Sequence, residues 1–167
     1  MTHDPITKAV QCNLCTGCGA CAGVFPDFIK MIDDPLNGRR PVVQATADGK
    51  KAAKAAAKLC AGIAVDYTTL DRKDDIDATW GPVLATWEGF AADTEIRHRG
   101  SSGGAVTALA LFAVQSKRAA GVAHIRARAD DPRKNEAVIS RTRADLLLGA
   151  GSRYAQASAA EVIGEIS

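Results

Sequence analysis

The chain has few aromatic residues and no long apolar run. Phe, Trp and Tyr make up 5% of its 167 residues, and alanine supplies much of the 47% hydrophobic content. These numbers predict a lean hydrophobic core. The most apolar stretch, Ala105 to Val114, is far shorter than the ~20 residues of a transmembrane helix. We therefore expect no membrane span.

Neither sign of charge is in excess. Lys and Arg total 21 and Asp and Glu total 19, so the net charge is +2. A nucleic-acid binder that works by charge needs a basic surface, so we expect no nucleic-acid partner. The first residues also lack the basic segment and apolar run of a secretory signal. We therefore expect a cytoplasmic protein, whose cysteines stay reduced and are available to bind metal.

The order of local patterns divides the chain into three parts. Residues 1–70 are expected to hold the cysteines, an irregular loop and an Ala/Lys helix from about Asp48 to Cys60. Residues 71–79 are charged and aperiodic, which is typical of a linker. Residues 80–167 are expected to form an α/β domain. The predicted fold class is thus α+β or α/β, a small ferredoxin-like cysteine-loop segment followed by an α/β domain with a short mixed sheet.

Within the second domain, apolar periodicity predicts a strand over 83–90, a helix that begins at Ser101 and Ser102, and strands over 122–128 and 137–142. The residues between 90 and 100 are expected to form a turn. Thr142 with Asp145, and Ser158 with Glu161, each resemble the capping box that opens a helix.

Four of the five cysteines lie within ten residues, at positions 12, 15, 18 and 21. The C-x2-C-x2-C spacing of Cys15, Cys18 and Cys21 lets three thiolates reach three irons of a cubane, and the intervening glycines permit the tight turns. This run overlays that of bacterial ferredoxins, with Phe25 in place of the final cysteine. Cys60 is the distant candidate for the fourth ligand. We expect a [4Fe–4S] cluster on these four residues, with Cys12 as an alternative ligand.

Other interpretations of the cysteines remain open at this point. A zinc site normally uses two C-x2-C pairs separated by a longer span, so the short spacing here makes a zinc-binding module the less favoured alternative. Cys60 could be a small core residue, and Cys12 could be a free thiol beside the site.

Residues 100–105, Gly-Ser-Ser-Gly-Gly-Ala, open an apolar helix. Two hydroxyls, flexible glycines and the free N–H groups of a first helical turn could bind an anion or a polar ring. Arg97 and Arg99 could add contacts to a phosphate. A serine-capped helix start with glycines for close packing explains the same residues. His98 and His124 are expected to be ordinary turn and strand residues.

Together these segments resemble the β-subunit family of coenzyme F420 hydrogenase/dehydrogenase. The resemblance rests on residues 15–21, 59–62, 100–109 and 151–154 and covers roughly residues 10–160. It implies an oxidoreductase that carries a [4Fe–4S] cluster and FAD and passes electrons to or from a two-electron partner, with coenzyme F420 as a candidate substrate. It also implies flavin or substrate contacts at Arg99, Ser101, Ser102, Gly103, Gly104, Ser152 and Tyr154.

The resemblance also concerns size and partners. Members of this family are typically more than twice as long, so we expect the chain to be an N-terminal part without its C-terminal domain. The implied partners are a redox subunit or electron carrier and a small-molecule hydride donor or acceptor. A non-catalytic [4Fe–4S] carrier or adapter without flavin is the alternative. No side chain is assigned a catalytic role.

Overall fold

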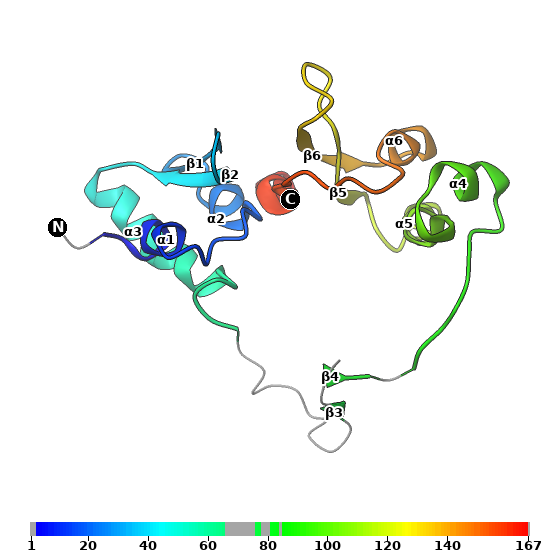
Figure 1. The fold of residues 1–167 in the computed structure, drawn as a ribbon, viewed down its shortest axis with the longest axis horizontal. Helices are drawn as coiled ribbons and strands as arrows, with labels where there is room; N and C mark the ends of the chain where they lie inside the picture. The colour runs from blue at the N-terminus through cyan, green and yellow to red at the C-terminus, as the bar shows by residue number, and fades with distance from the viewer. Residues whose placement is uncertain (1–2, 66–75, 78–80, 84, 167) are drawn as a thin grey trace.

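A computed structural model describes residues 3–65, 76–77, 81–83 and 85–166 (Figure 1). The described part of the N-terminal half contains three α-helices, one antiparallel hairpin and a short 3-10 helix. These are α1 (Pro5–Gln11), α2 (Ala20–Val24), β1 (Ile29–Asp34), β2 (Gly38–Val43), α3 (Ala47–Ala56) and η1 (Ala57–Leu59).

Local sequence explains where these helices begin. Asp4 accepts a hydrogen bond from the Thr7 N–H (2.9 Å) and caps α1, and Thr46 caps α3 in the same way through the Gly49 N–H (3.0 Å). The core of this half is built mainly from small side chains, because Ala22, Ala53 and Ala56 let helices and hairpin approach closely. The buried cluster consists of Ile6, Ala22, Ile29, Ala53 and Ala56.

The C-terminal half contains helices around a second hairpin. Its elements are β3 (Ile76–Asp77), β4 (Gly81–Pro82), α4 (Thr94–Arg99), η2 (Ser102–Gly104), α5 (Ala105–Gln115), β5 (Val122–Ala127), β6 (Asn135–Ser140), α6 (Arg143–Leu148) and η3 (Ala159–Glu165). A separate buried cluster of Ala91, Ile96, Leu111 and Leu146 holds α4, α5 and α6 together.

The predicted α+β class is confirmed. The helix predicted at Ser101 is η2 followed by α5, and the two strands predicted after it are β5 and β6. Their pairing is antiparallel from Val122–Ser140 to Ala127–Asn135. In the described residues each sheet is a two-stranded antiparallel pair, so a hairpin takes the place of the expected mixed sheet.

Some of the expected secondary-structure elements differ from those in the structure. Val83 and residues 85–90 do not form a strand, and the expected turn after them contains α4, because Asp93 caps it by accepting from the Ile96 N–H (3.0 Å). The irregular loop expected around the cysteines contains α2. Residues 66–75 and 78–80, which include most of the predicted linker, lie outside the described residues.

The C-terminal residues 158–164, which we call the clamp, lie between the two halves (Figure 1). The clamp packs against α2 on one side and against β5 and β6 on the other. Asp33 adds a second connection, since its carboxylate pairs with Arg128 (3.0 Å) and Lys134 (3.1 Å) from the C-terminal half. No helix within the described ranges has both the length and the apolar character needed to cross a bilayer.

Candidate functional site

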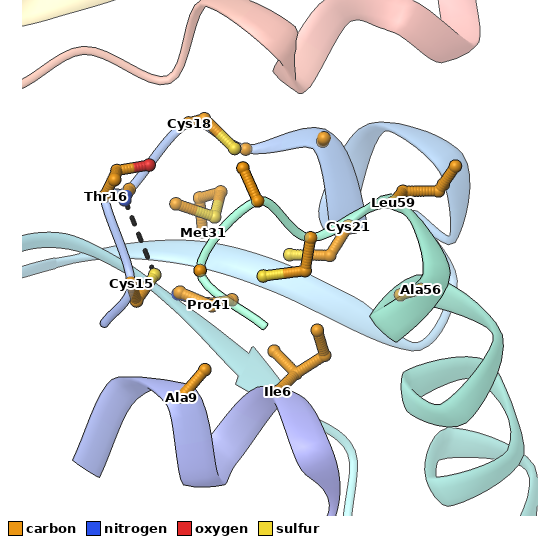
Figure 2. A pocket seen from close by; sticks show the side chains of 16 residues that line it. Ile6, Ala9, Cys15, Thr16, Cys18, Cys21, Met31, Pro41, Ala56 and Leu59 are labelled. Atoms are coloured by element: carbon orange, nitrogen blue, oxygen red, sulfur yellow. Dashed lines mark hydrogen bonds between the residues drawn. The ribbon is translucent and has the colours of Figure 1, made fainter. Parts of the chain in front are cut away.

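Four of the five cysteines line one pocket in the N-terminal half. Cys15, Cys18 and Cys21 come from the loop before α2 and from α2 itself, and Cys60 follows η1. Figure 2 shows Ile6 and Ala9 of α1 on one side of this pocket, with Met31 and Pro41 of the hairpin nearby. The surroundings of the thiols are therefore largely apolar. The structure thus brings the distant Cys60 to the same pocket as the three loop cysteines.

The backbone of this loop depends on two buried glycines. Gly17 and Gly19 have φ angles of +75° and +85°, which side chains rarely adopt. A Cβ at Gly17 would also lie 2.7 Å from the Arg39 carbonyl oxygen. The Gly17 N–H donates to Cys15 Sγ (3.4 Å), the bond drawn in Figure 2. The glycines are required both for the turns and for this N–H to reach sulfur.

The pocket thiols affect one another electrostatically. Burial raises the pKa of the Cys21 thiol to about 11, and the other three pocket cysteines contribute to the rise. Four thiolates in one apolar pocket repel one another unless a positive centre lies among them. Binding of a metal centre would therefore release protons from this pocket.

Cys12 lies outside this group. It is exposed at the C-terminal end of α1 and lines a neighbouring hollow with Pro5, Lys8 and Ile63. Within the described residues, the pocket that contains the other four cysteines is not lined by Cys12.

A second hollow lies in the C-terminal half and brings together three of the predicted flavin contacts. Ser101 and Ser102 precede α5, Ser152 follows α6, and all three line this space. It has a volume of about 300 Å³ and is open to solvent. That size lies at the lower end of the ~300–1,000 Å³ typical of cofactor and ligand sites.

The other predicted contacts do not line this hollow. Gly103 and Gly104 have φ angles of +67° and +73°, and a Cβ on either would lie 2.7 Å or less from Phe90 or Ile96 atoms, so both have a structural role. Arg99 pairs with Glu95 (3.1 Å). Tyr154 is 95% exposed.

His124, which was expected to be an ordinary strand residue, lines this hollow. Its Nε2 lies 2.7 Å from the Ser140 hydroxyl, and a Cβ at Gly149 would lie 2.6 Å from its Nδ1. Burial lowers the pKa of His124, so the neutral imidazole is favoured at neutral pH. Strand alternation could have identified this residue, since it places His124 on the same face of β5 as Val122.

Comparison with known proteins connects this second hollow to a family. Residues 86–164 match the model described as coenzyme F420 hydrogenase/dehydrogenase, beta subunit N-term. Over this stretch, slightly less than half of the chain, the sequence is similar to that family. The match includes every residue that lines the second hollow, and it includes the clamp, whereas the four pocket cysteines precede it. The family is that of an oxidoreductase subunit, which implies partner subunits. No curated protein matches the chain.

Proposed function

We propose that the chain is an electron-transfer part of an iron–sulfur flavoprotein β subunit. In this proposal Cys15, Cys18, Cys21 and Cys60 hold a [4Fe–4S] cluster, and the hollow beside Ser101, Ser102 and Ser152 holds the flavin of FAD. The observation that carries the proposal is that Cys60 lines the same pocket as the three loop cysteines. The family match to 86–164 supports the oxidoreductase class.

The spacing of the cysteines favours a cluster over a single zinc ion. A zinc site normally uses two C-x2-C pairs separated by a longer span. Cys15, Cys18 and Cys21 instead form one C-x2-C-x2-C run, and Cys60 lines the same pocket. This spacing is typical of a [4Fe–4S] cluster, in which each thiolate would bind a different iron. Among the described residues, no three or more His, Cys, Asp or Glu side chains are arranged around a single metal ion.

The residues that line the second hollow suit a flavin chemically. The hydroxyls of Ser101 and Ser102 and the imidazole of His124 supply polar groups, while Val106 and Leu146 supply apolar surface. The N–H groups of the first turn of α5 are not capped by a side chain. They could therefore donate to a phosphate or to a ring carbonyl.

When bound, FAD would exchange a pair of electrons with a hydride donor or acceptor and exchange them one at a time with the [4Fe–4S] cluster, which would connect a two-electron partner to a one-electron path. The apolar side chains around the thiols limit water in the cysteine pocket. Ser140 orients His124 at the flavin hollow, where burial keeps the imidazole neutral. Coenzyme F420 is a candidate for the two-electron partner. A small-molecule hydride donor or acceptor of another kind fits equally.

Anaerobic purification followed by iron, acid-labile sulfide and flavin quantitation tests the proposal. We expect four irons and four sulfides per chain, a broad absorption band near ~400 nm, and flavin uptake on titration with FAD. A cluster band without flavin uptake would support the carrier alternative. One zinc per chain without iron or sulfide would overturn the proposal.

Matched cysteine variants test the ligand assignment. Cys60→Ser should lose most of the iron because a serine hydroxyl is a poor replacement for a thiolate. Cys12→Ser makes the same chemical change at an exposed position outside the pocket and should keep the wild-type iron content. The reverse result would transfer the fourth ligand from Cys60 to Cys12.

A further inference from the structure

The clamp holds the cysteine loop through two backbone carbonyl groups. The Ser158 hydroxyl donates to the Gly17 carbonyl oxygen (2.8 Å), and the Ala160 N–H donates to the Cys18 carbonyl oxygen (2.9 Å). Figure 2 shows the stretch from Cys15 to Cys18 between the pocket and the clamp, which is the pale red ribbon. Both carbonyl groups therefore point away from the pocket.

Peptide geometry then fixes the direction of two N–H groups. In a trans peptide the C=O and the following N–H point in opposite directions, and cis peptides are absent from the described residues. The Gly17 carbonyl shares its peptide with the Cys18 N–H, and the Cys18 carbonyl shares its peptide with the Gly19 N–H. Both N–H groups therefore point toward the pocket. Neither donates a hydrogen bond to another residue in the described ranges.

We propose that Ser158 is a positioning residue, which directs the N–H groups of Cys18 and Gly19 at the metal centre and thereby raises its reduction potential. This inference rests on the proposed cluster at the four pocket cysteines. Hydrogen bonds to the sulfur atoms are among the factors that set the potential of such a cluster. The positive ends of N–H dipoles favour the more negative, reduced state.

Burial and several hydrogen bonds hold the Ser158 side chain in its position. It is 3% exposed, and its hydroxyl also accepts a hydrogen bond from Arg39 Nε (3.2 Å). The Arg39 guanidinium pairs in addition with Glu161 of the clamp (2.6 Å) and with Asp33 of β1 (3.1 Å). Because Arg39 donates to the hydroxyl oxygen, the hydroxyl proton is left to bond the Gly17 carbonyl.

Three single variants of the full chain test this role. Ser158→Ala removes the hydroxyl, and Ser158→Thr keeps it. Ser116→Ala is the matched control, since the Ser116 hydroxyl also donates to a backbone carbonyl (Phe112, 2.6 Å) but is exposed at the end of α5. Circular dichroism checks folding. Iron and sulfide content and an anaerobic redox titration of the visible band are then measured for each protein.

We expect Ser158→Ala to shift the one-electron equilibrium at least tenfold toward the oxidised form, which corresponds to a potential more negative by about 59 mV. Ser158→Thr and Ser116→Ala should stay near wild type. Equal potentials in all four proteins would overturn the role of Ser158 and leave the cluster intact. The role of Ser158 would also be refuted if Ser158→Ala and Ser158→Thr changed the potential or the iron content by the same amount. A wild-type protein without iron and sulfide would overturn both proposals.

Discussion

Replacement of Gly23 by alanine has two opposing effects on the stability of the folded protein. Gly23 lies inside α2, and alanine in a helix is favoured over glycine by roughly 0.5–1 kcal/mol. Helix propensity alone therefore predicts a more stable protein. The structure predicts the opposite, because a Cβ at this position would lie 2.5 Å from the Ala160 carbonyl oxygen and 2.9 Å from that of Glu161. Both obstacles are backbone atoms of the clamp, so a side-chain rotation cannot relieve them.

The size of the effect follows from these distances. Ordinary van der Waals contact begins at 3.4 Å, so α2 and the clamp must separate by about 0.9 Å. That movement stretches the hydrogen bonds from Ser158 and Ala160 to the cysteine loop, which are now 2.8 and 2.9 Å long. Each such bond contributes about 0.5–1.5 kcal/mol. Together with overpacking, we expect Gly23→Ala to destabilise the protein by about 1–3 kcal/mol despite the helix propensity.

Thermal unfolding followed by circular dichroism measures this effect. About 2–4 °C of Tm is lost per kcal/mol in a chain of this length, so we expect a decrease of roughly 2–12 °C. Gly89→Ala is the control, since a Cβ there meets nothing within 4 Å. Its Tm should not fall. A Gly23→Ala protein with an unchanged or higher Tm would refute the contact between α2 and the clamp.

Three further predictions concern the second half of the chain. Asn135→Ala should cost about 1–3 kcal/mol in urea unfolding, because the buried Asn135 amide donates to the carbonyl of Ala155 (2.7 Å); an unchanged midpoint would contradict this. The Arg143 guanidinium lowers the pKa of the Asp93 carboxyl to about 2. The wild-type Tm should therefore exceed that of Asp93→Asn above about pH 4, and the difference should disappear as pH falls toward 2. A Tm difference that does not change with pH would argue against the ion pair. Burial lowers the pKa of His124. The Tm of the wild type should therefore fall relative to that of His124→Gln as pH falls below about 6.5. Parallel curves of Tm against pH for the two proteins would show that His124 has the same pKa in the folded and unfolded states.

Local features of the sequence predicted local structure well. Thr142 and Asp145 form the expected capping box at α6, because both partners lie within one turn of helix. The alternating patterns gave β5 and β6 for a similar reason, since a two-stranded hairpin is built from neighbouring segments. The strand expected over 83–90 failed because a short apolar run does not specify its partner.

Ser158 shows why the same pattern can fail. With Glu161 it has the spacing of a capping box, yet the Ser158 hydroxyl makes no capping bond. It donates instead to Gly17, 141 residues away. The capping bond contributes about as much as any neutral hydrogen bond, so a competing acceptor supplied by tertiary packing is enough to redirect the hydroxyl.

Short sequence patterns predict the chemistry of the candidate sites. The C-x2-C-x2-C spacing, the glycines between the cysteines and the Ser-Ser-Gly-Gly turn depend only on neighbouring residues. Which distant residues complete these sites depends on tertiary packing. It brought Cys60 to the loop cysteines, placed His124 beside Ser101 and set the clamp against the loop. These contacts depend on how helices and hairpins pack, and no short-range pattern encodes that packing.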